Sequence, residues 1–245
     1  MIPKFVFLWT DLVLYAMVIA AAAYGWHVRR SPNLRASWKR VFNDAPALAS
    51  SVVLGMFLMV TLLDSVHYRR ALPPSPTAAP STPVAYDTRT TSLLDAMLQT
   101  QINAREASYS QPLGYQGFTK ESKVVNGKTE RVFPRLAFGG AHLTDPEKQW
   151  SGDVTRRALA GLGFGMLGAI VVWLASAALY ARRAEVRFGE ALGYLARNET
   201  RQPLRAGLFT ATVICLLVGP AVALMPYYHV LGTDRTGNDV LVQAR

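Results

Sequence analysis

Four stretches of about 20 mainly apolar residues constrain this chain more than any other feature of its sequence. They cover residues 5–26, 46–66, 158–181 and 206–227. A helix needs roughly 20 apolar residues to cross the hydrocarbon core of a bilayer, where its backbone polar groups must all be paired within the segment. The sequence therefore predicts a mainly α, polytopic membrane protein with two transmembrane hairpins, 1–66 and 158–227.

The overall charge fits the same class of protein. The 245 residues are 51% hydrophobic, yet the formal net charge is +10. A strongly basic chain can bind nucleic acid. Here, however, the apolar residues stand in long blocks, which is typical of a membrane protein with basic residues in the loops beside the bilayer. We therefore expect membrane lipid, and no nucleic acid, among its partners.

The residues that bind metals or form disulfides are few and scattered. The single cysteine, Cys215, excludes an internal disulfide, and no C-x-x-C pattern is present. The four histidines are far apart in the chain: His27, His67, His142 and His229. We expect no metal site and no cofactor.

The basic residues of the short loops predict the orientation. Residues 27–45 contain five Lys or Arg against the single acid Asp44, and residues 182–205 contain six Arg against three Glu. Short loops rich in Lys and Arg stay in the cytoplasm. Both chain ends and residues 67–157 then face the periplasm, in a multi-pass protein of a bacterial inner (plasma) membrane. The first apolar run is longer than a signal peptide's and precedes a dense cationic loop, so we expect it to remain uncleaved.

The segment 67–157 has the pattern of a small α+β periplasmic domain inserted between the second and third spans. Residues 72–84 are rich in Pro, Ser and Ala, as in an extended linker. Residues 91–107 have helical periodicity. The run KVVNGKTERVF predicts a hairpin whose tight turn is Asn126-Gly127.

A search for catalytic groups finds no nucleophile with its base, no phosphate loop and no paired carboxylates in a soluble segment. We therefore expect no enzyme. The run GLGFGMLG at 161–168 superficially resembles a nucleotide loop, but it lies inside an apolar span. Its small residues Gly161, Gly165 and Gly168 predict close approach of another helix.

One acid and several aromatic residues stand at notable positions in the spans. Asp11 lies one to two turns from the start of the first span. It is either an intramembrane polar site or, as we expect, an interfacial acid at the positive end of a helix. Six aromatic residues near span ends predict interfacial anchors: Trp9, Trp26, Trp150, Tyr180, Tyr227 and Tyr228.

The tail HVLGTDRTGNDVLVQAR, residues 229–245, follows the fourth span directly. Gly232 and Gly237 flank a tight polar turn, and Asp234 or Asp239 can cap the helix that follows. From position 238 the sequence predicts a short amphipathic helix at the membrane surface. Its apolar side would carry Val240, Leu241 and Ala244.

This tail resembles the H-P-L-G-T-D-x-x-G-R-D-V-L-S-R signature of the dipeptide, oligopeptide and nickel ABC-transporter permeases, the binding-protein-dependent transport inner membrane components. The matching residues are Gly232, Thr233, Asp234, Gly237, Asp239, Val240 and Leu241. Val230 and Asn238 replace the family's Pro and Arg. The resemblance covers about the last 40 residues, and in the family the signature is periplasmic and follows a transmembrane helix.

The resemblance implies a transport function. Such permeases pair with a second permease subunit, receive peptides or similar small solutes from a periplasmic substrate-binding protein, and couple to separate cytoplasmic ATPase subunits. Their coupling loop has an E-A-A-like pattern after the signature, whereas FGEALGY at 188–194 precedes it. We expect this chain to be the N-terminal part of such a permease, with the coupling loop beyond Arg245. The alternative is a non-transporting membrane sensor or assembly scaffold whose segment 67–157 binds a ligand or partner.

Overall fold

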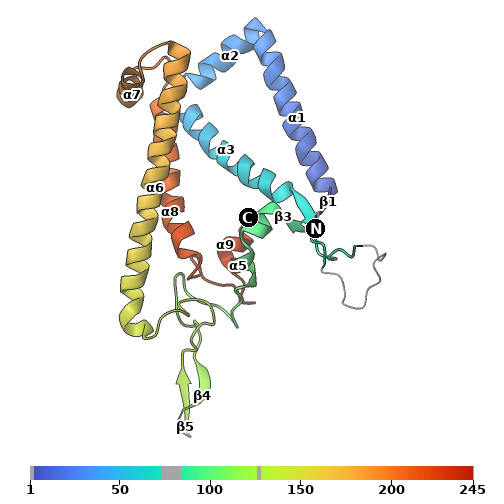
Figure 1. Ribbon diagram of the computed structural model, residues 1–245, viewed down its shortest axis with the longest axis vertical. Coiled ribbons are helices and arrows are strands. Elements are labelled where there is room, and N and C mark those ends of the chain that lie inside the picture. Colours follow the sequence, from blue (N-terminus) through green and yellow to red (C-terminus); the bar gives the residue numbers. More distant parts are fainter. Residues whose placement is uncertain (1–2, 73–83, 126–127, 245) are drawn as a thin grey trace. The chain divides into compact units, whose positions relative to one another are not determined.

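The computed structural model describes residues 3–72, 84–125 and 128–244 (Figure 1). Its elements are mainly helices, with two small sheets. Four helices are long and apolar enough to cross a membrane, which confirms the predicted number of long apolar helices: α1 (Trp9–Arg30), α3 (Ala45–Ser65), α6 (Pro146–Ala184) and α8 (Leu204–Leu224). The chain divides into two compact units, Met1–Met97 and Leu98–Arg245.

A three-stranded antiparallel sheet organises the first unit. Strands β1 (Lys4–Val6), β2 (His67–Arg69) and β3 (Thr91–Ser92) lie side by side in that order. Because β1 precedes α1 and β2 follows α3, the sheet brings the start of α1 to the end of α3. The two helices also meet there through the Tyr15 hydroxyl, which donates to the Ser65 carbonyl at 3.0 Å.

The other ends of α1 and α3 are joined by α2 (Pro32–Phe42), so that the three helices form three sides of a triangle (Figure 1). Pro32 stands at the first position of α2, where a missing N–H costs nothing. Trp38 stacks on Phe42 and meets Tyr24 of α1 edge to face. Most apolar side chains of α1 are exposed, and those of α3 are exposed or half-buried; the buried residues of the two helices are the polar Asp11 and Ser65.

The single helix predicted over 91–107 is wrong, because the structure divides this segment into β3, α4 (Leu93–Met97) and α5 (Gln99–Asn103). The Ser92 N–H donates to Asp95 at 3.0 Å, and the Asp95 N–H donates to the Ser92 hydroxyl at 2.9 Å. This reciprocal capping starts α4 only after the strand. The Ser92 hydroxyl also donates to Asp64 at 2.9 Å.

In the second unit, α6 is 39 residues long and begins well before the predicted third span. At 1.5 Å per residue it measures about 58 Å, roughly twice the hydrocarbon thickness of a bilayer. Its first three turns, residues 146–157, are polar. They therefore give no hydrophobic signal, although they are helical.

Helix α8 runs antiparallel along α6 (Figure 1), and small residues let the two backbones touch. A Cβ atom on Gly161 would lie 2.5 Å from the Cα of Pro220, and one on Gly165 would overlap the carbonyl oxygen of Cys215. The predicted close helix packing is confirmed for these two glycines. A Cβ on Gly168 would make only an ordinary contact, 3.8 Å from the sulfur of Cys215.

Smaller elements complete the second unit. Helix α7 (Phe188–Arg197) packs through its buried Leu195 against Ala177 of α6 and Leu208 of α8. The predicted hairpin is confirmed as β4 (Glu121–Val125) paired with β5 (Lys128–Val132). Its Asn126-Gly127 turn lies outside the described residues, as do residues 73–83 of the predicted linker. Helix α9 (Val240–Gln243) ends the described chain.

Candidate functional site

The tail after α8 folds into a compact turn, which we call the signature turn (residues 229–243). The Asp234 carboxylate accepts hydrogen bonds from the N–H groups of Thr236 at 2.8 Å and Asn238 at 2.9 Å. The Asp234 N–H in turn donates to the Asn238 carbonyl at 2.9 Å. A short acid at this position thus closes the turn on itself, which a longer side chain would not do.

Gly237 satisfies two requirements of this turn. Its φ is +78°, a conformation that residues with a Cβ rarely adopt. A Cβ atom there would also overlap the carbonyl oxygen of Glu106, whose N–H donates to the Gly237 carbonyl at 2.9 Å. Gly232, with φ +77°, is packed similarly against the carbonyl of Ser110. Glycine is therefore required at both positions by the backbone and by its neighbours.

Asp239 is the N-cap of α9. The sequence offered Asp234 and Asp239 as candidates for this cap, and the structure assigns it to Asp239. Its Oδ1 accepts from the Leu241 N–H at 2.8 Å, and its Oδ2 lies 2.8 Å from Nδ1 of His229. The predicted apolar side of this helix is wrong, because Val242 is buried whereas Ala244 is exposed. The helix therefore packs inward through Val242.

His229 and Glu106 form a buried pair beneath the turn. His229 is completely buried, and its Nε2 lies 3.3 Å from Oε1 of Glu106. The Glu106 carboxylate also accepts three backbone hydrogen bonds, from Ala137 at 2.7 Å, Phe138 at 2.8 Å and Gly139 at 3.1 Å. The imidazole thus lies between two carboxylates, those of Glu106 and Asp239.

The hydrogen bonds of this cluster outweigh the cost of burying its charges. Burial by itself would raise the pKa of Glu106, but the hydrogen bonds from His229 and three N–H groups lower it to about 2. Burial would lower the pKa of His229, but its bonds to Asp239 and Glu106 raise it to about 9. At neutral pH the cluster is therefore an imidazolium between two carboxylates.

Thr233 attaches the turn to the segment before the hairpin. Its hydroxyl donates to the Ser108 carbonyl at 2.8 Å and lies 3.1 Å from the Ser110 hydroxyl. The Leu113 N–H donates to the His229 carbonyl at 2.9 Å. We call the signature turn, together with residues 104–118 and 134–157, the polar lobe.

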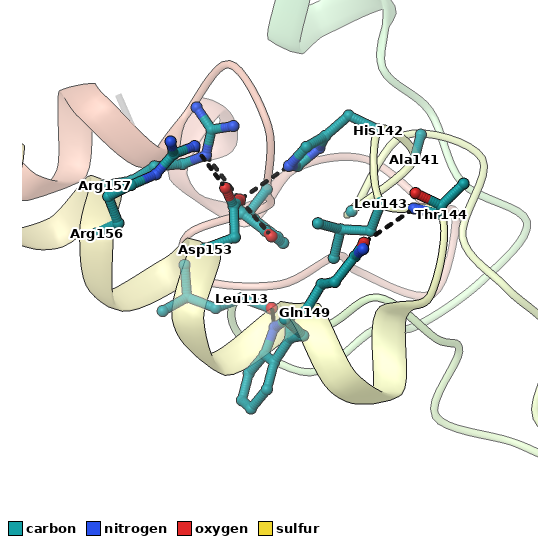
Figure 2. A network of polar contacts seen from close by, with 12 residues as sticks. Leu113, Ala141, His142, Leu143, Thr144, Gln149, Asp153, Arg156 and Arg157 are labelled. Carbon is teal, nitrogen blue, oxygen red and sulfur yellow. Dashed lines mark hydrogen bonds and ion pairs between the residues drawn. The ribbon is translucent and has the colours of Figure 1, made fainter.

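A second polar network holds the parts of the lobe together at the start of α6 (Figure 2). The Asp153 carboxylate, at its centre, binds His142 at 2.8 Å, Arg157 at 2.7 Å and the Tyr228 hydroxyl at 2.9 Å. Arg156 lies on the same carboxylate at 3.2 Å. One carboxylate of α6 therefore holds the loop before that helix and the chain that leaves α8.

Two of the predicted membrane-interface aromatics belong to this lobe instead. Tyr228 is completely buried, so its assignment as an interfacial anchor is wrong. The Trp150 indole donates to the Leu113 carbonyl at 2.8 Å, which fixes it inside the lobe. Trp9 and Trp26, at the two ends of α1, are 85% and 61% exposed, as anchors in a lipid interface would be.

Asp11, the candidate intramembrane acid, lies in the first turn of α1 and is 4% exposed. Its carboxylate accepts from the Leu8 N–H at 3.1 Å and lies 2.9 Å from Nδ1 of His67. These contacts are those of a helix N-terminus and of the strand beside it. They account for the burial of Asp11 without a bound solute.

The structure brings Gly232, Thr233, Asp234, Gly237 and Asp239 together in one turn, and it leaves the side chain of Asn238 at the edge, bonded to the Thr236 hydroxyl at 2.7 Å. Asp11 belongs to the other unit. Glu106 and Asp153 were not among the predicted site residues. No local pattern marks either acid, although the three histidines opposite Asp11, Asp153 and Glu106 are visible in the sequence.

Among the described residues, no group of three or more His, Cys, Asp or Glu side chains is arranged to hold a metal ion. Both ring nitrogens of His229 are already engaged by carboxylates. Comparison of the chain with protein-family models, with curated proteins and with solved structures gives no match. The geometry of the signature turn therefore carries the functional argument.

Proposed function

We propose that this chain is the N-terminal membrane and periplasmic module of a permease component of an ATP-driven ABC transporter for peptides or similar small solutes in the bacterial inner membrane. Its role is that of a transport component, with ATP hydrolysed by separate cytoplasmic subunits. The polar lobe is periplasmic in this arrangement, and the loops carrying α2 and α7 are cytoplasmic.

One observation supports this proposal above the others: the residues that match the permease signature are those that the fold of the turn requires. Gly232 and Gly237 have positive φ, Asp234 closes the turn and Asp239 caps α9. A chance match would have no reason to satisfy these four demands at once. Asn238, which departs from the signature, contributes a backbone N–H that any residue except proline supplies.

The position of the turn agrees with the same role. It follows α8, a membrane-length helix, and is fixed to α6 through Tyr228 and Asp153. In a permease, the periplasmic mouth is where a substrate-binding protein and a second permease subunit would dock. The lobe offers exposed apolar side chains for such docking, including Tyr109 and Phe118.

The test is to purify the tagged gene product, expressed from its own chromosomal locus, from host membranes. We expect a second permease subunit and an ATPase subunit to co-purify, with vanadate-sensitive ATP hydrolysis. Gly237→Val should abolish assembly, because a β-branched residue fits neither the φ nor the space beside Glu106.

Asn238→Ala is the matched control, because it keeps the backbone N–H that Asp234 binds and loses only an exposed hydrogen bond to Thr236. Assembly of this variant should match that of the wild type. A protein that purifies without any ATPase would overturn the transport proposal in favour of a sensor or assembly scaffold. Equal, mild effects of the two variants would contradict the role assigned to the turn.

A further inference from the structure

The corner between α1 and α2 carries a dense group of cations. All five are exposed: Arg29, Arg30, Arg35, Lys39 and Arg40. Among the described residues, none of them forms an ion pair with an acid. A helix C-terminus favours a cation in its last turn, which accounts for Arg29 and Arg30 on α1 and for Lys39 and Arg40 on α2, but not for Arg35 or for the gathering of all five cations at one corner.

A recess of about 580 Å³ lies on the last turns of α1, at the α1 side of this corner. Its lining residues share one helical face: Ala22, Gly25, Trp26, Arg29 and Arg30. The guanidinium of Arg30 lies 4.7 Å from the centre of the Trp26 ring. The lining is therefore apolar toward the middle of α1, at Ala22 and Gly25, and cationic at the end of the helix, at Arg29 and Arg30.

Helix α2 also carries apolar and cationic residues on different sides. Leu34, Trp38 and Phe42 recur on one side, whereas Arg35 and Lys39 stand one turn apart on another. A short helix with aromatic residues on one face and cations on the other lies in the plane of a membrane surface. Because α2 joins the ends of two membrane-length helices, the headgroup region of the bilayer is the depth at which it would lie.

We propose that this corner is a binding site for the headgroup of an anionic phospholipid, with Arg29 and Arg30 on the phosphate and Trp26 beneath it. The cations supply the charge that an anionic headgroup complements. Ala22 and Gly25 leave space for the start of an acyl chain, since a Cβ atom on Gly25 would meet no other atom within 4 Å. This inference depends on the proposed membrane placement of α1 and not on transport.

The experiment uses the full chain in detergent, titrated with phosphatidylglycerol or with phosphatidylcholine and followed by native mass spectrometry. We expect phosphatidylglycerol to bind more tightly, and the double variant Arg29→Gln/Arg30→Gln to weaken it about 30-fold, at roughly five-fold for each cation near a membrane surface. With all arginines kept, Trp26→Leu should weaken phosphatidylglycerol binding more than Trp9→Leu does, because Trp9 lies at the other end of α1.

Arg182→Gln/Arg183→Gln is the matched control, because this pair is also exposed and also ends a membrane-length helix. It should keep the affinity of the wild type. Equal losses in the two double variants, or no preference for phosphatidylglycerol, would overturn the proposal. Displacement of the lipid by millimolar inorganic phosphate would do so too, because the site would then belong to a soluble anion.

Flotation with phosphatidylcholine vesicles separates the failure of this inference from that of the membrane placement. If the chain floats with the vesicles but shows no preference for phosphatidylglycerol, only the proposed headgroup site is contradicted. A chain that does not float contradicts the membrane placement itself. Size-exclusion profiles of the variants establish that each remains folded, which is expected because the substituted arginines are exposed.

Discussion

His229 is completely buried between two carboxylates, those of Glu106 and Asp239, and these two partners explain why the fold tolerates a charged imidazole there. An unpaired charge in such a place costs several kcal/mol, whereas one held between carboxylates is stabilised by them. Glu106 is equally dependent on its surroundings, since three backbone N–H groups and the imidazole saturate its oxygens. The cluster therefore holds together three segments that are far apart in the chain.

This pair makes the stability of the lobe depend on pH. The pKa of His229 rises to about 9, so its contribution is complete below about 6.5 and is lost as the pH increases through 9. The pKa of Glu106 falls to about 2, so its contribution is complete above about 4.5 and is lost toward pH 2. We expect the thermal unfolding temperature of the purified chain to be highest between pH 4.5 and 6.5.

His229→Gln should lower the free energy of unfolding by about 3–5 kcal/mol at pH 6, the usual cost of breaking a buried ion pair. The difference from the wild type should shrink at pH 9.5, where the wild-type imidazole has also lost its proton. His27→Gln is the control, because His27 is exposed on α1. A His229→Gln deficit that is the same at both pH values would show that packing, not charge, is what the histidine contributes.

Helices α6 and α8 approach each other closely, and the packing depends on the absence of side chains at their glycines. Gly165 lies against the Cys215 carbonyl, whereas Gly163, only two residues away, faces open space. Helices that approach so closely gain dispersion contacts along their backbones. The two glycines therefore provide a direct comparison on one helix.

Gly165→Ala should destabilise the second unit by about 1–3 kcal/mol, because the added methyl group forces the two backbones apart. Gly163→Ala should be neutral or slightly stabilising, since alanine is the better helix former and meets nothing there. Thermal unfolding in detergent measures both. A Gly165→Ala variant as stable as the wild type would mean that α6 and α8 are not in contact at Gly165.

At this scale the sequence predicts what depends on local pattern and fails where distant segments decide. The four spans were predicted because their lengths and apolar composition match a bilayer. The early start of α6 was not, since residues 146–157 are polar and their helix is fixed by Asp153 and Trp150. The apolar spacing of 91–107 does not reveal the break, because the break depends on the reciprocal hydrogen bonds between Ser92 and Asp95 and not on hydrophobic periodicity.

The site shows the same division. The turn itself was predictable, because Gly and Asp at fixed offsets are needed by its own backbone. Glu106 was not, because it meets His229 across 123 residues of sequence, and nothing near it distinguishes it from other surface acids. Buried ion pairs of this kind become visible only when the fold has brought the segments together.

For the whole molecule, the arrangement of cations predicts opposite sides of the membrane for different exposed positions. In a background with Cys215→Ala, Ser122→Cys on β4 should react with a membrane-impermeant maleimide in cells whose outer membrane is permeabilised. Ser37→Cys on α2 and Gly189→Cys on α7 should react only after the inner membrane is opened. All three positions are exposed, so access to the reagent is decided by the membrane.

If Ser37→Cys reacts while the inner membrane is intact and Ser122→Cys does not, the orientation is the reverse of the proposed one. Equal labelling of all three in intact cells would contradict the spans themselves. The test also applies to each unit by itself, because Ser37 and Ser122 belong to different units, and Gly189 belongs to the same unit as Ser122.

The length of α6 has a mechanical consequence. This helix runs without a break from the Asp153 network to Ala184, the residue at which the chain turns toward α7. A continuous helix of this kind would transmit a tilt as a lever, rather than bend as a hinge. A tilt of only about 5° at the lobe would displace its far end by about 5 Å over its length of roughly 58 Å. In the proposed orientation, an event that disturbs the lobe would thus reach the opposite face of the membrane as a movement comparable to one helical turn.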